Sequence, residues 1–379
     1  MRRAVIVDAK RTAIGKVGGM FKSLGPEQLA SEVIRALITN NQLNPADIDE
    51  VILGNAIGPG GNIARLTSLT AGLPVHVPGV TLDRQCGSGL EAINYVCRLV
   101  QAGAGEIYLA GGVESSSLAP WKIAKPSTLY DRPTLFERAR FSPDSIGDPD
   151  MGVAADNVAC HYNISRSDQD KFALDSHKKA LIAQEAGRFT NEIVPLLGKS
   201  QDEGPRARLN KRLLSRLKPA FSIDGTVTAG NACAINDGAS LALIMSEDMC
   251  LSLGLRPKLT FIDATSAGVD PNLLGIGPVP AVKKLLQRSQ LTIDEIDLVE
   301  FNEAFASQVL ASIDALKIPL DKLNLGGGAI AYGHPYGASG AILVTRLMNE
   351  LLTRQNKYGL ATLGIGGGLG LATLFERYE

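Results

Sequence analysis

Short, mostly apolar segments along this chain alternate with longer segments of helical spacing. The short segments, which are strand candidates, lie at residues 4–7, 51–53, 80–82, 107–110, 241–244, 260–263, 299–301 and 361–363. Residues 26–40 place Leu29, Val33 and Leu37 on one helical face. Further helices are predicted at residues 90–100, 165–186 and 337–348. Apolar strands that alternate with helices predict an α/β fold with mostly parallel sheets covered by helices.

The second part of the chain repeats the first at a constant offset of 248 residues. Residues 33–38 align with 281–286, 48–51 with 296–299, and 96–99 with 344–347. The same offset places Cys86 on His334 and Gly54 on Asn302. Two copies related by a pseudo-two-fold axis bring equivalent loops to one cleft. The candidate nucleophile and the candidate base are therefore expected to meet there, within hydrogen-bond reach.

Residues from about 116 to 220 interrupt the repeat with several prolines and a polar helical segment. We therefore expect residues 1–115 with 221–255 as an N-terminal half, 116–220 as an inserted loop domain, and 256–379 as a C-terminal half. Residues 226–228 are expected to form a strand that returns to the first half. Basic residues gather in the insert at Lys199, Arg206, Arg208, Lys211, Arg212, Arg216 and Lys218. They fit either a solvated face or a pocket wall for a phosphorylated ligand.

The composition fits a globular protein that buries large cores, with 379 residues, 45% hydrophobic and 20% charged. A net charge of -1 provides no global basic field for nucleic acid or a membrane surface. Five cysteines without metal or disulfide spacing predict no metal site and a reducing compartment, expected to be the cytoplasm. The first apolar stretch is too short for a signal peptide, and no run of about 18 apolar residues predicts a membrane span.

The sequence QCGSGLEA around Cys86 lies where the strand at 80–82 gives way to the helix at 90–100. Glycines at 87 and 89 permit a tight turn with positive φ. Cys86 would then lie at a helix N-terminus, where the dipole and free amides favour a thiolate and could hold an oxyanion. A buried structural cysteine and a dinucleotide-binding glycine loop are the alternatives. The second is disfavoured because no acidic residue ends the next strand about 20 residues on.

The glycine-rich sequence GGGAIAYGHPYGASG contains His334, and NEAFA at residues 302–306 follows the strand at 299–301. Pro335 biases His334 away from helix. A lone loop histidine is more often structural, but its equivalence to Cys86 favours catalysis. Asn302 lies at a strand end, the usual ligand edge of a parallel sheet, and it could also cap the next helix.

These motifs resemble the thiolase family. CGSG at Cys86, NEAFA at Asn302 and GHPYGASG at His334 carry the resemblance, together with AGGVES at 110–115 and GTVTAGN at 225–231. The match runs in order from Arg3 to the C-terminus. It implies a duplicated five-layer α/β/α/β/α sandwich of two five-stranded halves, with the insert as a CoA-binding loop domain. It also implies acyl-CoA and CoA as substrates, no separate cofactor, and a homodimer or homotetramer.

The resemblance assigns roles to individual residues. Cys86 would take the acyl group as a thioester, and His334 would activate it. His334, with a water held by Asn302, would polarise one thioester oxygen, and the amides of Cys86 and Gly366 would hold the other. The implied activity is acyl transfer from CoA to Cys86, with reversible condensation and thiolysis of 3-ketoacyl-CoA of the acetoacetyl type. The residues implied for substrate and CoA binding are Met151, Arg206, Ala229, Cys233 and Phe305.

The chain departs from the family pattern at its C-terminal motif. The family ends with a second catalytic cysteine in a Cys-x-Gly pattern, and Gly364 occupies that position here. Cys233 stands where serine is frequent, and Asp150 precedes Met151 where biosynthetic members often carry histidine. Three function classes stay open: a thiolase-type acyltransferase impaired at Gly364, a degenerate homologue that binds acyl-CoA without C–C bond chemistry, and a ketosynthase-type condensing enzyme. Asn302 disfavours the last, because ketosynthases tend to carry a second histidine there.

Overall fold

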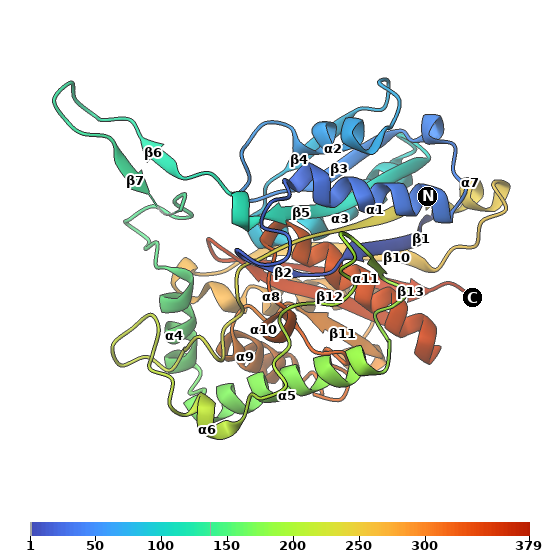
Figure 1. Cartoon of the computed structure of the whole chain (residues 1–379). Coiled ribbons are helices and arrows are strands. Elements are labelled where there is room, and N and C mark those ends of the chain that lie inside the picture. The colour runs from blue at the N-terminus through green and yellow to red at the C-terminus, as the bar shows by residue number, and fades with distance from the viewer. Residues whose placement is uncertain (1, 137) are drawn as a thin grey trace.

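In the computed structural model, which describes residues 2–136 and 138–379, the strands of both halves join into one continuous sheet (Figure 1). Its strand order is β11-β12-β13-β10-β1-β9-β5-β3-β4. The halves meet where β1 (Ala4–Thr12) pairs with β10 (Leu259–Gly268). That junction is short, since it consists of the pairs Val5–Thr260 and Ile6–Leu259.

The two halves have related strand arrangements. The N-terminal half contains five strands: β1, β9 (Asn236–Ser246), β5 (Ile107–Ser115), β3 (Glu50–Gly54) and β4 (Gly79–Leu82). The C-terminal half contains β10, β13 (Leu369–Arg377), β12 (Tyr358–Ile365) and β11 (Leu298–Phe301). The expected fifth strand of the second half is reduced to one bridge between Val299 and Leu323 among the described residues. Short strands β2 (Gly15–Lys16) and β8 (Ile193–Val194) pair with β9 and β1.

Helices cover and separate the two half-sheets, which confirms the predicted five-layer sandwich. Helices α1 (Pro26–Asn40) and α2 (Ile63–Ala71) cover the outer face of the first half, and α8 (Pro278–Ser289) and α9 (Ala306–Leu316) cover that of the second. Helices α3 (Ser88–Ala102) and α11 (Tyr336–Arg354) lie between the halves. One apolar core surrounds this central pair, and one core lies under each outer layer.

The repeat read from the sequence is a repeat of structure. α3 begins at Ser88 and α11 at Tyr336, which is the position equivalent to Ser88 at the offset of 248. β3 and β11 are equivalent in the same way. Cys86 and His334 therefore each precede the central helix of their own half, as the duplication predicts.

The central helices approach so closely that only glycine fits at their contact. A Cβ added at Gly89 would lie 2.5 Å from the carbonyl oxygen of Gly337, and one at Gly340 would lie 2.5 Å from the backbone nitrogen of Leu90. Both are well inside van der Waals contact with backbone atoms, which cannot rotate away. The absence of a side chain at both positions lets the two central helices, and the loops that precede them, lie this close together.

We expect Gly340→Ala to destabilise the fold by about 1–3 kcal/mol, the usual range for overpacking a closely packed contact. Gly268→Ala is the matched control, because a Cβ at Gly268 has its nearest neighbour at 3.9 Å. Urea unfolding of the two variants and the parent measures the difference. Equal stability of Gly340→Ala and Gly268→Ala would contradict the proposed close contact.

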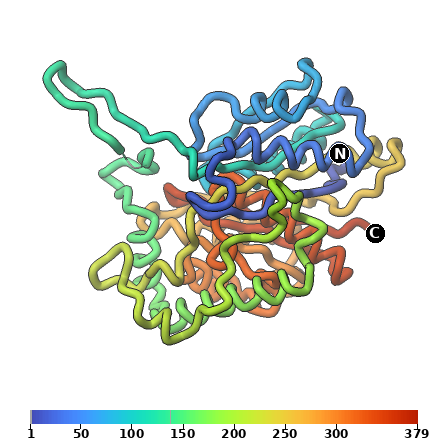
Figure 2. Tube along the Cα trace, viewed as in Figure 1, coloured from blue at the N-terminus to red at the C-terminus, as the bar shows by residue number. Residues whose placement is uncertain are grey.

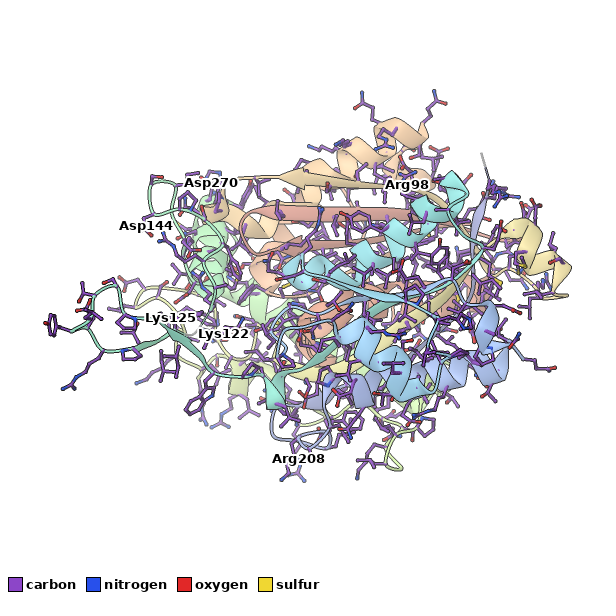
Figure 3. The ribbon with its side chains drawn as sticks, turned by 90° about the horizontal axis from the view of Figure 1, so that it is seen from above. Arg98, Lys122, Lys125, Asp144, Arg208 and Asp270 are labelled. Carbon is purple, nitrogen blue, oxygen red and sulfur yellow. The ribbon has the colours of Figure 1, made fainter. Side chains whose placement is uncertain are left out.

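The insert contains a projecting hairpin and three helices. β6 (Lys122–Ala124) and β7 (Thr134–Phe136) form the hairpin, which extends away from the sandwich, whereas α4 (Met151–His161), α5 (Arg166–Glu185) and α6 (Lys211–Leu214) pack beside the C-terminal half (Figures 1 and 2). Figure 3 shows Lys122 and Lys125 on the hairpin and Arg208 at the surface. The remaining helices are the short α7 (Glu247–Ser252) and α10 (Ala329–Tyr332).

The strand predicted at residues 226–228 is wrong. The amides of Thr226 and Val227 donate to the carboxylate of Asp156 at 2.8 and 2.9 Å, and that of Thr228 donates to Asn231 Oδ1 at 2.8 Å. These side chains take the hydrogen bonds that a sheet partner would otherwise accept, so the segment is an irregular loop rather than a strand.

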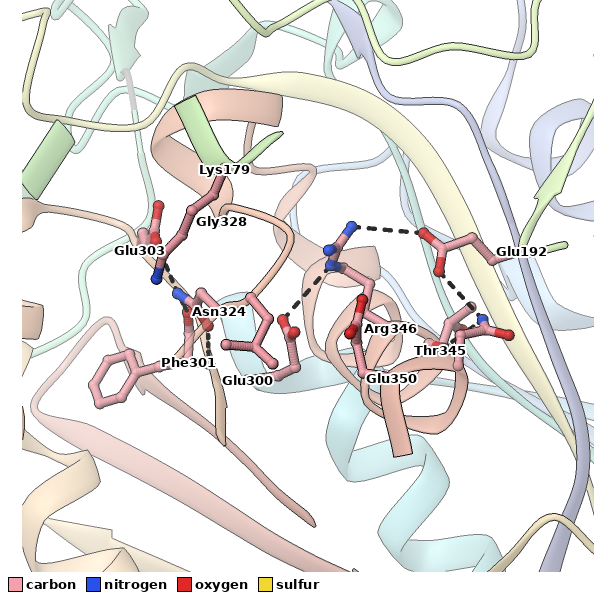
Figure 4. Close-up of polar contacts among 12 residues, drawn as sticks. Lys179, Glu192, Glu300, Phe301, Glu303, Asn324, Gly328, Thr345, Arg346 and Glu350 are labelled. Atoms are coloured by element: carbon pink, nitrogen blue, oxygen red, sulfur yellow. Dashed lines mark hydrogen bonds and ion pairs between the residues drawn. The ribbon is translucent and has the colours of Figure 1, made fainter. Parts of the chain in front are cut away.

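Buried ion pairs join the insert to both halves, and Figure 4 shows those of Arg346 with Glu192 and Glu300. Glu192 from the insert accepts from Arg11 of β1 at 2.8 Å and lies 3.6 Å from Arg346 of α11. Arg346 also lies 3.6 Å from Glu300 of β11. Asp202 pairs with Arg11 at 2.7 Å. All five side chains are buried. Removing one partner would therefore leave an uncompensated buried charge, which destabilises a fold strongly.

Candidate active site

Cys86 lies in a strained turn between β4 and α3. It is the middle residue of a 3₁₀ turn (Gln85–Gly87), and Gln85 has a φ of 45°, in the left-handed region that favours glycine. The sequence predicted positive φ at the neighbouring glycines, but Gly87 has a φ of -82°. Gly87 is required for packing instead, since a Cβ there would lie 2.4 Å from Ile365 Cδ1. The C-terminal half therefore presses directly against the turn that carries Cys86.

Cys86 is partly buried, at the wall of a cavity. Burial raises the pKa of Cys86 to about 12, and the negative charge of Glu114 raises it further. The backbone N–H groups of Cys86 and Gly366 lie close enough to the sulfur to oppose this rise. The helix N-terminus was expected to favour the thiolate, but burial outweighs it, so the resting side chain is a thiol.

We expect alkylation of Cys86 by iodoacetamide to accelerate steadily between pH 7 and pH 10, because the thiolate fraction grows throughout that range when the pKa is near 12. A free cysteine peptide, which levels off near its ordinary pKa of about 8.5, is the reference. Peptide mass mapping isolates Cys86 from the other thiols. A plateau below pH 8 would instead reveal a preformed thiolate–imidazolium pair.

His334 is buried in a polar setting that fixes its ring. Nδ1 lies 2.6 Å from Ser339 Oγ, and Nε2 lies 3.4 Å from Asn302 Nδ2. The backbone N–H of His334 donates to Asn236 Oδ1 at 3.1 Å. Burial lowers the pKa of His334 to about 4, so the imidazole is neutral at physiological pH. A neutral ring whose Nδ1 is engaged by Ser339 can present Nε2 as a base.

The structure places the two halves of the candidate site on loops that precede the two central helices. Among residues 2–136 and 138–379 no hydrogen bond joins Cys86 to His334, and the reach between the Cys86 sulfur and a His334 nitrogen stays a prediction. Tyr336 adjoins both: its ring centre is 5.1 Å from that of His334, and it lines the same cavity as Cys86. Ile235, which lines that cavity too, is bridged to His334.

The cavity at Cys86 has a volume of about 670 Å³ and opens beside the hairpin. Cys86, Gly366 and the predicted Met151 line it. Sequence reasoning missed several of its lining residues: Ile57, Trp121, Phe136, Phe141, Ile235 and Tyr336. Only Tyr336 carried a usable signal, because it stands two residues after His334 in GHPYG. The hairpin residues gave none, since their position depends on how the insert folds.

Four residues predicted to bind CoA lie outside this cavity. Arg206 lines a separate hollow of about 520 Å³ with Leu213 and Leu217, and the exposed Ala229 lies one residue from Gly230, which faces Leu217. Phe305 packs with Met151 and crosses the ring of Phe221 at 6.1 Å.

Cys233 is the fourth of these residues. It packs against a small cluster that includes Ile14 and Tyr332. The route from Arg206 to Cys86 is therefore not one continuous cavity in this structure.

Gly364 occupies β12 two residues before Gly366, and its side-chain position faces α9 rather than the Cys86 cavity. A Cβ there would lie 2.7 Å from Gln308 Nε2 and 3.2 Å from the carbonyl oxygen of Gly275. Its φ is not in the left-handed region, so the backbone itself would accept a side chain. Gln308 fills the space into which a cysteine at 364 would extend.

Glu303, the neighbour of Asn302, has a structural role. Its carboxylate accepts hydrogen bonds from Ser176 at 2.6 Å and from Asn324 at 2.8 Å, and burial raises its pKa. It thus joins α5 of the insert to the loop before His334. No cluster of His, Cys, Asp and Glu suited to a metal, and no helix long and apolar enough to cross a membrane, is found among the described residues.

Two family models cover nearly the whole chain: "Thiolase, N-terminal domain" matches residues 4–248 and "Thiolase, C-terminal domain" matches residues 255–377. The chain belongs to the thiolase family. Among its relatives is "Putative acetyl-CoA C-acetyltransferase VraB" of Staphylococcus haemolyticus, 51% identical with all of both chains covered. The protein of the same name from Staphylococcus aureus strain MRSA252 is 50% identical over the same coverage.

A solved thiolase-family structure has the same fold. The crystal structure of the Bacillus anthracis acetyl-CoA acetyltransferase superposes with a TM-score of 0.94 at 37% identity, covering 100% of this chain and 99% of that one. The likeness extends over both halves and the insert. The chain is therefore similar to these thiolases throughout its length.

Proposed function

We propose that this thiolase is an acyl-CoA acyltransferase that carries the acyl group on Cys86. The observation that carries the proposal is the placement of Cys86 in a cavity of about 670 Å³, with the N–H of Gly366 beside its sulfur. The names of its relatives, which are acetyl-CoA acetyltransferases, support acetyl-CoA as a donor.

In the proposed reaction, His334 Nε2 takes the proton of Cys86 as the thiolate attacks the acyl carbonyl. Both groups are neutral at rest and share no hydrogen bond in the described part of the chain, so the proton passes from Cys86 to His334 only as the attack proceeds. The backbone amides of Cys86 and Gly366 hold the developing oxyanion. Asn302, 3.4 Å from His334, would hold a water that polarises the second thioester in the C–C bond step.

The CoA moiety is proposed to run from Arg206 past Ala229 to Phe305, Cys233 and Met151. The hollow at Arg206 supports this route, because it is lined by the cationic Arg206 side chain and by the apolar side chains of Leu213 and Leu217. Such a wall suits an adenine nucleotide, whose ring is apolar and whose phosphates are anionic. In this proposal Arg206 binds the phosphates of CoA, whereas other basic residues of the insert can remain exposed to solvent.

A second candidate function rests on Gly364. Without a thiol at this position, the protein could bind acyl-CoA and acylate Cys86 but make or break no C–C bond. The two functions share Cys86 acylation and differ in the fate of 3-ketoacyl-CoA.

Incubation with acetyl-CoA followed by peptide mass mapping tests the proposal. Acetyl on Cys86 is expected, and acetyl on Cys160 or Cys250 would reject the assignment. Cleavage of acetoacetyl-CoA in the presence of CoA, measured beside acyl exchange between acetyl-CoA and labelled CoA, then separates the two candidate functions.

We also propose that the protein works as a homodimer or homotetramer in the cytoplasm. Strand β4 ends the sheet with an open edge and an exposed Val80, and the neighbouring α2 exposes Leu66 and Leu69. Open edges and apolar patches of this kind favour association. Light scattering measures the assembly.

The cysteines of the described chain are all free, which suits a reducing compartment.

A further inference from the structure

We propose that the hydroxyl of Tyr336 exchanges the proton with the substrate carbon when the C–C bond is broken, in place of the thiol that Gly364 lacks. The proposal rests on the proposed acyltransferase function, because it assigns one step of that reaction. In this proposal the role of the thiol that is absent at position 364 passes to a hydroxyl on a different loop, the one that carries His334.

Position 364 cannot supply the proton in this chain. It has no side chain, and its Cβ direction leads to Gln308 at 2.7 Å rather than to the cavity. The proton must therefore come from a side chain that lines the Cys86 cavity and carries an exchangeable hydrogen. The candidates by chemistry are Gln85, Trp121, Ser116, Lys122, Arg138, Asp83 and Tyr336.

Geometry leaves Tyr336 as the best placed of these groups. Arg138 is ion-paired with Asp148 and Asp150, and Ser116 Oγ donates to the carbonyl of Asn236 at 2.8 Å. Asp83 is exposed at the rim. The Gln85 amide and the Trp121 indole are far weaker acids than a phenol, and Lys122 belongs to the projecting hairpin.

Tyr336 is free to act. Its hydroxyl makes no hydrogen bond within the described part of the chain, and it is not sealed from solvent. Its ring lies 5.1 Å from that of His334 and within electrostatic range of the Cys86 sulfur. Glu114 holds the loop in place by accepting from the N–H of Gly337 at 3.1 Å.

The proposed step balances as follows. The Cys86 thiolate adds to the 3-keto carbonyl of the substrate, and the C2–C3 bond breaks with its electron pair on C2. Tyr336 donates its proton to C2, which releases acetyl-CoA and leaves a phenolate. The phenolate takes the proton of the incoming CoA thiol, and the CoA thiolate then attacks the thioester on Cys86. Cys86 finally recovers its own proton from His334.

The environment of Tyr336 favours this direction. Burial raises the pKa of its phenol, and negative charge on Cys233, Cys86 or Glu114 raises it further. The phenol is thus kept protonated, ready to donate, and its phenolate is a strong base for the CoA thiol. Condensation would need the phenolate at the outset, so cleavage should be the faster direction.

The test compares two donors that leave the same acetyl group on Cys86. Acetyl-CoA acetylates Cys86 by breaking a C–S bond, whereas acetoacetyl-CoA does so by breaking the C–C bond. In single-turnover mass mapping, Tyr336→Phe should slow the acetylation of Cys86 by acetoacetyl-CoA by about 10²-fold or more, the scale of general acid catalysis. The rate of acetylation by acetyl-CoA should change by less than about threefold. Tyr332→Phe, the same change four residues earlier on a buried side chain, is the control. Cys233→Ser tests the rival thiol.

Each other outcome has one meaning. Equal slowing with both donors would show that Tyr336 only positions the site, and no slowing would exclude it; both overturn the proposal. Loss of the C–C step in Cys233→Ser alone would transfer the role to Cys233. If the parent is acetylated by acetyl-CoA but not by acetoacetyl-CoA, the Tyr336 proposal fails while acyl transfer stands. If acetyl-CoA leaves Cys86 unmodified, the proposed function itself fails.

Discussion

Replacing Cys86 by serine is expected to lower turnover in acyl exchange and in acetoacetyl-CoA cleavage by about 10⁴-fold or more, as the loss of a nucleophile does in other covalent enzymes. A serine hydroxyl is far less acidic than a thiol, and the buried setting that raises the pKa of Cys86 to about 12 would disfavour an alkoxide still more. Initial-rate assays with both reactions measure the loss.

Cys160→Ser is the control for this change, because Cys160 is an exposed cysteine at the end of α4. It should retain full activity. Substantial acyl exchange by the Cys86→Ser variant would show that CoA transfers its acyl group without Cys86, and would remove the basis of the proposed function.

Introducing a thiol by Gly364→Cys is expected to change C–C bond cleavage and acyl exchange by less than about threefold, far below the ~10²–10⁴-fold contributed by a well-placed general acid or base. The reason is that the side chain at 364 points to Gln308 and not into the Cys86 cavity. The backbone at 364 permits the side chain, and Gln308 is the obstacle. Acetylation of Cys86 by acetoacetyl-CoA and by acetyl-CoA provides the two rates.

The double variant Gly364→Cys with Gln308→Ala separates chemistry from crowding, because it opens the space that the Gln308 amide occupies 2.7 Å from the new Cβ. Gln308→Ala alone is its control. A gain of about 10²-fold or more in acetoacetyl-CoA cleavage without an equal gain for acetyl-CoA, in either thiol variant, would show that position 364 does reach the reacting carbon.

The sequence predicted the features that depend on periodicity and duplication. The helix at 26–40 is found with those bounds, and the five-layer arrangement follows from the repeat that places α3 and α11 in the centre. The strand predicted at 226–228 is not found, because the side chains of Asp156 and Asn231 accept hydrogen bonds from its backbone N–H groups. Asp156 lies about 70 residues earlier in the chain. Propensity alone contains no information about such partners.

The candidate site was predicted in its residues but not in its electrostatics. Cys86 and Gly366 share a cavity, and Asn302 and His334 are neighbours, as the motifs suggested. The rise in the pKa of Cys86 depends on how deeply the second half covers the turn, through contacts such as that of Ile365 with Gly87. Tyr336 was overlooked because its importance arises only when the direction of position 364 is known.

The charges that join the insert to the sandwich limit how this enzyme could be re-engineered. Exchanging residues 116–220 for the corresponding segment of another thiolase is an obvious way to alter acyl-chain preference. Such a graft would leave Arg11 and Arg346 inside the protein without Glu192 and Asp202 unless the donor segment supplied equivalent carboxylates. A functional chimera therefore needs compatible partners at these four positions, which are remote from the substrate and would not be chosen by looking at the cavity.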